Sequence, residues 1–253
     1  MMRKKRIPKV LLACEESQAV AIEMRKIGIE AYSCDILPCS GSRPEWHIQG
    51  DIFKVLNPTD DGELEAVSFS TADGKIHIVE KWDMIIAFPP CTFLTATGNR
   101  WFNVEKYGDK AIERIRQREL ATQFVERIWL AKCDRVVIEN PIGYLSTHFR
   151  KPSQIVHPYY FAEKENDENC ERKATCLWIR GKLPLLQRLN YEFEPRIIKY
   201  KNGKGTDSPW HLNTISLPPA ERAKARAKTF PGVAKAMATQ WGEILLKEAV
   251  LDV

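Results

Sequence analysis

The 253-residue sequence predicts an α/β fold built on a doubly wound sheet with parallel strands. Two short strand-like runs, Met84–Phe88 and Arg135–Ile138, have the hydrophobicity of strands that are buried on both faces. An amphipathic helix over residues 110–131 would provide the crossover between them. Near the N-terminus a strand, a loop, a helix, a second strand and an acidic residue follow one another. This is the order of the nucleotide-binding half of such a sheet.

The first of these elements is a buried strand over Lys9–Cys14. Ser17 follows in a short loop and can cap a helix that continues to about Ile27 on a broad apolar face. A second strand, Ala31–Cys34, is closed by Asp35. A third strand end is expected at residues 50–52, which again contain an acid.

The rest of the chain is less regular. Residues 57–80 have the character of an insertion, in which Ala72–Lys75 is a hairpin signal between two short strand-like pieces. Residues 93–108 are polar and interrupted by glycine, which predicts a mobile loop. Arg172–Ile179 predicts a further strand, and the apolar face of residues 233–245 predicts a C-terminal helix.

The composition is that of a globular protein with a modest positive charge. Its formal net charge of +5 permits nucleic-acid binding without requiring it. No apolar run reaches membrane-spanning length, and the seven irregularly spaced cysteines favour reduced thiols in a cytoplasm. Cys170, Cys176 and His157 lack the tight spacing of a zinc knuckle, so we expect no metal site.

A thiol and a carboxylate stand just past the ends of the two central strand-like runs. Cys91 follows Pro89-Pro90, which end the first run, and Glu139-Asn140-Pro141 ends the second. A thiolate that adds to carbon 6 of cytosine makes carbon 5 nucleophilic, and a carboxylic acid assists by protonating or hydrogen-bonding ring nitrogen 3. Each feature alone has a plainer interpretation, as a small buried cysteine or as a turn, but together they favour catalysis.

With Pro90-Cys91 after one strand and Glu139-Asn140 after the next, the chain resembles the cytosine-5 DNA methyltransferases, and most closely the short forms carried by phages. The resemblance implies a Rossmann-like S-adenosylmethionine-dependent methyltransferase fold with a small target-recognition insert. It makes Cys91 the nucleophile and Glu139 the acid. The glutamine that usually follows the family's cysteine is Thr92 here, which we expect to contact DNA.

The same resemblance implies that S-adenosylmethionine binds at the first three strand ends. The first loop has no G-x-G-x-x-G and carries two glutamates, which would repel a pyrophosphate but suit a sulfonium and an ammonium. Asp35 would then accept from the ribose hydroxyls, although acids also simply cap strand ends. The expected cofactor-binding residues are Ala13, Cys14, Glu15, Glu16, Ser17, Asp35, Ile36, Asp51, Ile52 and Pro89.

Two further segments match family motifs. Lys173 and Thr175 stand near the positions of the arginines that hold the target base, and are therefore expected at the catalytic site. Residues 229–237 resemble the closing motif, whose helix packs beside the cofactor. The resemblance thus gives a catalytic domain over residues 1–144 and 213–253, with a recognition region over residues 145–212.

DNA is the expected partner, and the protein is expected to act as a monomer. Asn99-Arg100-Trp101 lies in the predicted mobile loop, which could close on DNA and fill the gap left by an extruded base. Basic residues in the recognition region would grip phosphates, unless they form a solvated loop. The expected DNA-binding residues are Thr92, Asn99, Arg100, Arg196, Lys199, Lys201 and Lys204.

The function so implied is transfer of a methyl group from S-adenosylmethionine to carbon 5 of a flipped cytosine in DNA, in the cytoplasm of a bacterial or phage-infected cell. Three alternatives stay open: an RNA cytosine-5 methyltransferase, an amino-methyltransferase, and an inactive relative that only binds DNA. An amino-methyltransferase would need an aromatic residue in place of Cys91, and it forms no covalent adduct.

Overall fold

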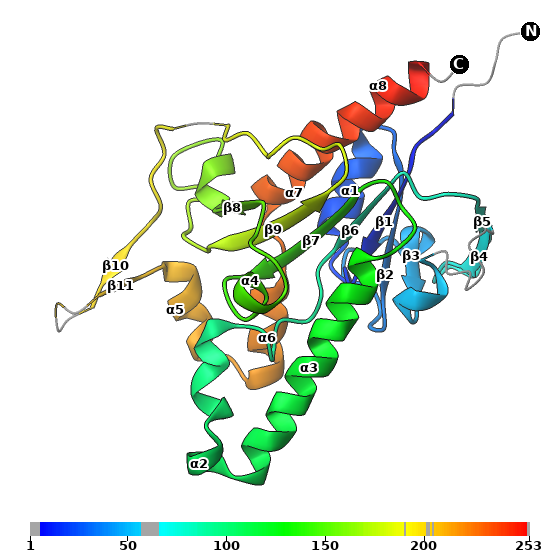
Figure 1. Ribbon diagram of the computed structural model, residues 1–253. Helices are drawn as coiled ribbons and strands as arrows, with labels where there is room; N and C mark the ends of the chain where they lie inside the picture. Colours follow the sequence, from blue (N-terminus) through cyan, green and yellow to red (C-terminus); the bar gives the residue numbers. More distant parts are fainter. Residues whose placement is uncertain (1–5, 57–65, 190, 201–202, 204, 252–253) are drawn as a thin grey trace, which may run out of the picture.

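The computed structural model describes residues 6–56, 66–189, 191–200, 203 and 205–251. It confirms the predicted α/β class, with a mostly parallel central sheet of Rossmann-like order (Figure 1). The first five strands in the order below run parallel, and β9 is antiparallel to both of its neighbours. The order across the sheet is β3 (His47–Gln49), β2 (Glu30–Asp35), β1 (Lys9–Ala13), β6 (Met84–Ala87), β7 (Val136–Pro141), β9 (Thr175–Arg180) and β8 (Gln154–Val156).

Helices cover both faces of this sheet (Figure 1). On β1, Val10 and Leu12 face α1 (Ala19–Lys26) and α7 (Pro231–Met237), whereas Leu11 faces α3 (Asp109–Trp129) on the other side. A strand buried on both faces must be apolar at every position, because successive side chains point to opposite faces. Full burial of each such side chain contributes about 1.5–3 kcal/mol.

The N-terminus of α1 is capped by a residue that the sequence did not indicate. Glu15 is buried and accepts from the backbone N–H groups of Val20 (2.6 Å) and Ala21 (3.3 Å). The prediction that Ser17 caps this helix was wrong. Gln18 occupies the position before the helix in the left-handed conformation (φ 57°), and no side-chain cap bond forms there.

The predicted mobile loop after β6 is instead helical. It contains the 3₁₀ segment η3 (Ala96–Phe102) and the short helix α2 (Val104–Tyr107). Asn103 caps α2 by accepting from Lys106 N–H at 2.7 Å, and Gly108 (φ 52°) ends it and starts α3. The polar residues and glycine of this segment therefore cap helices and join them, and they do not indicate an irregular chain.

The predicted hairpin is confirmed as β4 (Val67–Ser70) paired with β5 (Ile76–Val79). Gly74 occupies its turn with φ 86°, a conformation that glycine adopts without steric cost. Residues 57–65 of the predicted insertion lie outside the described part of the chain.

The predicted recognition region, residues 145–212, is continuous with the main fold because β8 and β9 belong to the central sheet. The β10–β11 hairpin of this region extends away from the sheet (Figure 1). The remaining elements are η1 (Pro44–Trp46), η2 (Ile52–Lys54), α4 (Leu145–His148), η4 (Pro158–Phe161), β10 (Ile198–Lys199), β11 (Thr206–Asp207), α5 (Pro209–Ile215), α6 (Pro219–Ala227), η5 (Ala238–Gly242) and α8 (Glu243–Leu251).

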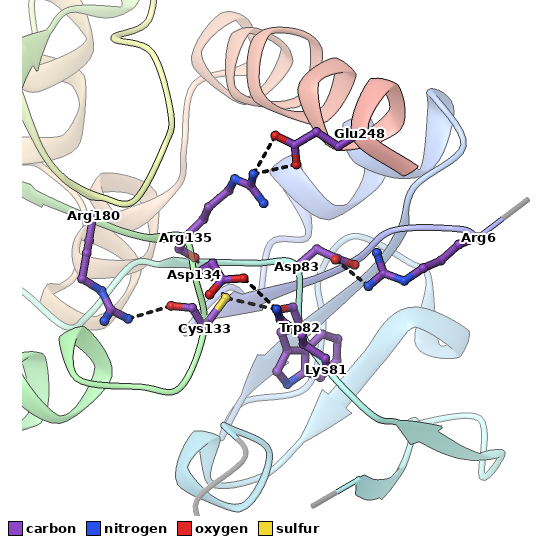
Figure 2. A network of polar contacts seen from close by, with 9 residues as sticks. All are labelled: Arg6, Lys81, Trp82, Asp83, Cys133, Asp134, Arg135, Arg180 and Glu248. Carbon is purple, nitrogen blue, oxygen red and sulfur yellow. Dashed lines mark hydrogen bonds and ion pairs between the residues drawn. The ribbon is translucent and has the colours of Figure 1, made fainter. Parts of the chain in front are cut away.

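A polar network joins the amino ends of β6 and β7 to both ends of the chain (Figure 2). Arg135, just before β7, donates to both carboxylate oxygens of Glu248 on α8 at 2.8 and 2.6 Å. Arg6 pairs with Asp83, just before β6, at 2.6 Å. The network therefore fixes the C-terminal helix and the N-terminal strand at the edge of the sheet opposite the carboxyl ends.

We expect Arg135→Ala to lower the free energy of unfolding by about 1–2 kcal/mol. The substitution removes an ion pair with two hydrogen bonds from a side chain that is only 13% exposed. Denaturant titration measures this. Arg116→Ala removes an exposed arginine, 3.5 Å from Glu113, and should cost less than about 0.5 kcal/mol. Equal losses in the two variants would show that the Glu248 pair contributes nothing beyond an ordinary surface charge.

Candidate active site

The site lies where the direction of strand order reverses. From β1 the chain builds β2 and β3 on one side of the sheet, and it then places β6 and β7 on the other. Phe88 N–H donates to the Ala13 carbonyl at 2.9 Å, so the first loop and the loop after β6 leave the sheet side by side. Ligands of open α/β sheets bind in the crevice at such a switch point.

Cys91 begins a tight turn beyond β6. Pro89 is buried and Pro90 is exposed, and the Cys91 carbonyl then accepts from Leu94 N–H (2.9 Å) and Thr95 N–H (3.1 Å). The prolines end the strand because neither can donate to a ladder. The thiol is partly buried at the mouth of the turn.

Glu139 comes from the next strand, β7. The expectation that Glu139-Asn140-Pro141 ends this strand was wrong, because β7 continues through Pro141 by pairing with β9. Its pairing with β6 does stop three residues earlier, at Ile138. Asn140 is buried and donates from Nδ2 to the Pro89 carbonyl at 2.8 Å. The residue beside the carboxylate thus holds the turn that carries the thiol.

The charges of Glu139 and Lys173 both act on Cys91. Burial raises the pKa of the Cys91 thiol, the nearby Glu139 carboxylate raises it further, and the Lys173 ammonium lowers it. Burial also raises the pKa of Glu139, again against the effect of Lys173. The three groups predicted to act together are therefore close enough to interact electrostatically. Burial therefore makes Glu139 easier to protonate than a free carboxyl group, while the charge of Lys173 opposes that shift and stabilises the thiolate.

Lys173 approaches from the segment before β9. Its Nζ donates to the Arg226 carbonyl at 3.1 Å, and it lies 5.4 Å from the Trp210 ring centroid and 5.9 Å from that of Phe230. Thr175 was also predicted at this site. It is buried at the start of β9, where its hydroxyl donates to the Lys173 carbonyl at 3.4 Å, so its contact is with the lysine backbone.

A glycine that the sequence analysis did not single out fixes the two loops together. Gly143 pairs with Thr95 in an isolated β-bridge, and Tyr144 N–H donates to the Leu94 carbonyl at 2.7 Å. A Cβ added at Gly143 would lie 2.0 Å from that carbonyl oxygen, so only glycine permits this approach. No local sequence pattern indicates such a contact, because it joins segments about 50 positions apart.

Gly143→Ala should therefore destabilise the protein by about 1–3 kcal/mol and displace the Cys91 turn, since backbone must move to admit the methyl group. Thermal and denaturant unfolding measure the effect. Gly50→Ala is the matched control, because its Cβ would have no neighbour within 4 Å. A Gly143→Ala variant as stable as this control would mean that the two loops are not held at this distance in solution.

Arg118 on α3 is a second residue that the sequence analysis missed. Its Nε donates to the Phe93 carbonyl at 2.8 Å, and a terminal nitrogen donates to Asn99 Oδ1 at 2.8 Å. Its guanidinium lies 3.2 Å from the Phe102 ring centroid and 4.6 Å from that of Tyr144. Arg118 thus binds the segment after the thiol to the segment after the carboxylate.

The expected cofactor loop holds one fully buried and one partly buried glutamate. The Glu15 carboxylate is occupied by the N-terminus of α1, and burial raises its pKa to about 8. Glu16 has a buried Oε2 that accepts no hydrogen bond from the described residues and lies 3.8 Å from Lys224 Nζ. Ser17 is partly exposed at the end of this loop.

Three more expected cofactor residues meet at the ends of β1, β2 and β3. Burial raises the pKa of Cys14, and the charges of Asp35 and Asp51 raise it further. Asp35 accepts from Leu37 N–H (2.9 Å), and Asp51 accepts from Phe53 N–H (3.0 Å). Each acid therefore makes the strand-end cap that was its plainer interpretation, while its charge still faces the same region.

The expected apolar cofactor contacts divide into exposed and buried ones. Ile36 is 76% exposed directly after β2, although it is a large hydrophobic side chain. Ala13 and Ile52 are buried in the core, which leaves their backbone as the part nearest the crevice. Pro89 is also buried, and its carbonyl is the acceptor for Asn140.

The expected DNA-binding residues that the structure describes differ in exposure and in their partners. Arg196 makes an ion pair with the buried Glu171, which also accepts from Trp210 N–H at 3.3 Å, so the charge of Arg196 is largely neutralised. Lys199 is exposed on the β10 strand. Lys201 and Lys204 lie outside the described residues. Around the Cys91 turn, Thr92, Asn99 and Arg100 are all exposed.

The described residues contain no group of three or more histidine, cysteine, aspartate and glutamate side chains arranged to hold a metal ion. Within the same part of the chain, no helix is both long and apolar enough to cross a membrane. No protein-family model matches the sequence, and a search of curated proteins finds no match.

Proposed function

We propose that the protein is an S-adenosylmethionine-dependent methyltransferase that modifies carbon 5 of cytosine in DNA. The observation that carries the proposal is the convergence of Cys91, Glu139 and Lys173 at the carboxyl ends of β6 and β7. A buried thiol beside both a carboxyl group and an ammonium is suited to covalent catalysis, because one neighbour handles a proton while the other stabilises the anion.

The chemistry assigned to these side chains begins with addition of the Cys91 thiolate to carbon 6 of the base. Lys173 favours the thiolate, because it lowers a pKa that burial otherwise raises. Burial raises the pKa of Glu139 and so makes this carboxyl easier to protonate than a free one; it protonates or hydrogen-bonds ring nitrogen 3 as the new C–S bond forms. After carbon 5 has gained the methyl group, it loses its proton to solvent and the Cys91 thiolate departs, and ring nitrogen 3 returns its proton to Glu139, which restores the aromatic ring.

The adjoining strand ends suit the proposed cofactor. When bound, S-adenosylmethionine supplies an electrophilic methyl group on a positively charged sulfur. Glu16 offers a buried carboxylate oxygen that accepts no hydrogen bond from the described residues, and its neighbour Lys224 Nζ lies 3.8 Å away; the cofactor's ammonium group would take the place of that longer ion pair. Asp35 and Asp51 add negative charge, and the exposed Ile36 offers an apolar surface for adenine. The same acids would repel a dinucleotide's pyrophosphate.

A cytosine stacked within a duplex cannot reach a partly buried thiol at the carboxyl end of the sheet, so the target base would have to leave the helix. A single-stranded RNA would avoid that step, and it is therefore the main alternative substrate. The aromatic and basic residues next to the Cys91 turn suit either nucleic acid, because stacking and phosphate contacts do not depend on the sugar.

The deciding experiment incubates the purified chain with methyl-labelled S-adenosylmethionine and, separately, with duplex DNA, single-stranded DNA and tRNA. We expect label in DNA, and bisulfite sequencing should place it at carbon 5 of cytosine. Label mainly in tRNA would indicate an RNA cytosine-5 methyltransferase. Label on an exocyclic amine would indicate an amino-methyltransferase, and DNA binding without label would indicate an inactive relative.

A further inference from the structure

A hollow of about 550 Å³ lies on the segment that follows the Cys91 turn. Two aromatic rings from η3 and α2, Trp101 and Tyr107, form part of its wall with centroids 5.1 Å apart. The guanidinium of Arg100 lies 4.7 Å from the Trp101 centroid, and Lys106 Nζ lies 5.4 Å from that of Tyr107. Trp101 is 40% exposed, which is unusual for so large an apolar side chain unless it has a partner.

The polar groups around the hollow are mainly hydrogen-bond donors. Arg100 and Lys106 can only donate. Asn99 and Asn103 also line it, but their carboxamide oxygens are already used by Arg118 and by Lys106 N–H, so their amide N–H groups are what they can offer. The described residues that line the hollow include no carboxylate. The matching ligand is rich in acceptors and presents flat aromatic faces.

The hollow is also held in a fixed position relative to Cys91. Arg118 anchors Asn99 from α3, and the guanidiniums of Arg114 and Arg118 lie 5.2 and 3.2 Å from the Phe102 ring centroid. Phe102 itself directly follows Trp101 in η3. A surface pre-organised in this way loses little conformational entropy when a ligand binds.

We propose that this hollow binds an unpaired nucleotide of the DNA substrate, with its base stacked on Trp101 or Tyr107 and its phosphate contacting Arg100 and Lys106. A nucleotide has the required combination of flat faces, base acceptors and an anionic phosphate. The inference rests on the proposed function and adds to it a preference for the form of the substrate. DNA with an unpaired nucleotide near the target cytosine should bind more tightly than the fully paired duplex.

Fluorescence anisotropy tests this with a labelled duplex, fully paired or with one unpaired nucleotide beside a central cytosine. All proteins carry Cys91→Ser and no cofactor is added, so that no reaction is needed for a signal. We expect Trp101→Ala to weaken binding of the unpaired substrate about 10-fold and of the paired duplex less than 2-fold. Trp101→Phe should restore most of the loss, because it keeps a stacking surface.

Arg116→Ala serves as the charge control, since this exposed arginine lies on α3 and does not line the hollow. This substitution should weaken binding of both duplexes by the same small factor. An equal effect of Trp101→Ala on the two duplexes, or no effect on either, would overturn the assignment of the hollow. If wild-type protein methylates DNA but Trp101→Ala changes the binding of both duplexes equally, the role of the hollow is wrong while the proposed reaction stands. If the protein prefers the duplex with an unpaired nucleotide but transfers no methyl group, the proposed reaction is wrong while the role of the hollow stands.

Discussion

Replacement of Cys91 by serine should abolish a covalent complex with DNA that contains 5-fluorocytosine. Fluorine cannot leave carbon 5 as a proton does, so the wild-type adduct cannot be eliminated and should survive denaturing electrophoresis. A serine hydroxyl beside Glu139 and Lys173 stays protonated and is a poor nucleophile. Methyl transfer to ordinary DNA should fall by at least about 10³-fold, the scale typical of losing a covalent nucleophile.

Cys39→Ser controls for thiol loss elsewhere, because Cys39 is also partly exposed but lies on the loop after β2. It should form the adduct at the wild-type rate. Methylation by wild-type protein with no adduct would contradict the covalent mechanism and favour an amino-methyltransferase. An adduct that persists in Cys91→Ser would place the nucleophile at another residue.

Glu139→Gln should slow methyl transfer by about 100-fold or more while making Cys91 more reactive towards a simple alkylating agent. Glutamine keeps the size of the side chain but cannot supply a proton, so addition to the base loses its acid. The Glu139 carboxylate raises the pKa of Cys91, and its removal should therefore increase the thiolate fraction at a fixed pH near 8. The two rates should change in opposite directions.

Single-turnover kinetics measure the first rate, and mass spectrometry of the iodoacetamide-treated Cys91 peptide measures the second. Lys173→Gln is the matched control, because loss of a charge that lowers the Cys91 pKa should slow alkylation as well as methyl transfer. A Glu139→Gln enzyme within a few-fold of wild type in methyl transfer would leave Glu139 as an ordinary strand residue. A parallel fall in both rates would point to general damage of the site.

The sequence predicted the strands that carry the site well, because buried parallel strands leave short apolar runs with abrupt ends. Met84–Phe88 followed by two prolines is such a run, and the thiol's place beyond it needed no tertiary information. The end of β7 was predicted less well. Its continuation through Pro141 depends on β9, an antiparallel neighbour that is contributed by residues about 40 positions away.

The features that hold the site together could not be predicted, because they join segments that are distant in the chain. In the sequence, Arg118 is one of several basic residues on a helix. Its contacts with the rings of Phe102 and Tyr144 are apparent only in the structure. Arg196 reads as a phosphate contact until its pairing with the buried Glu171 is known. In both cases the partner, and not the residue type, decides the role.

The buried cap of α1 makes the stability of this protein depend on pH. The pKa of Glu15 is raised from 4.5 to about 8 in the fold, so the native chain holds a proton that the unfolded chain releases. Stability from this group is therefore full below pH 4.5 and declines as the pH rises towards 8. The Cys91 thiolate has the opposite requirement, since its formation increases with pH. A mildly alkaline medium would favour the Cys91 thiolate while it lowers the stability of the fold, because it ionises a buried carboxyl group.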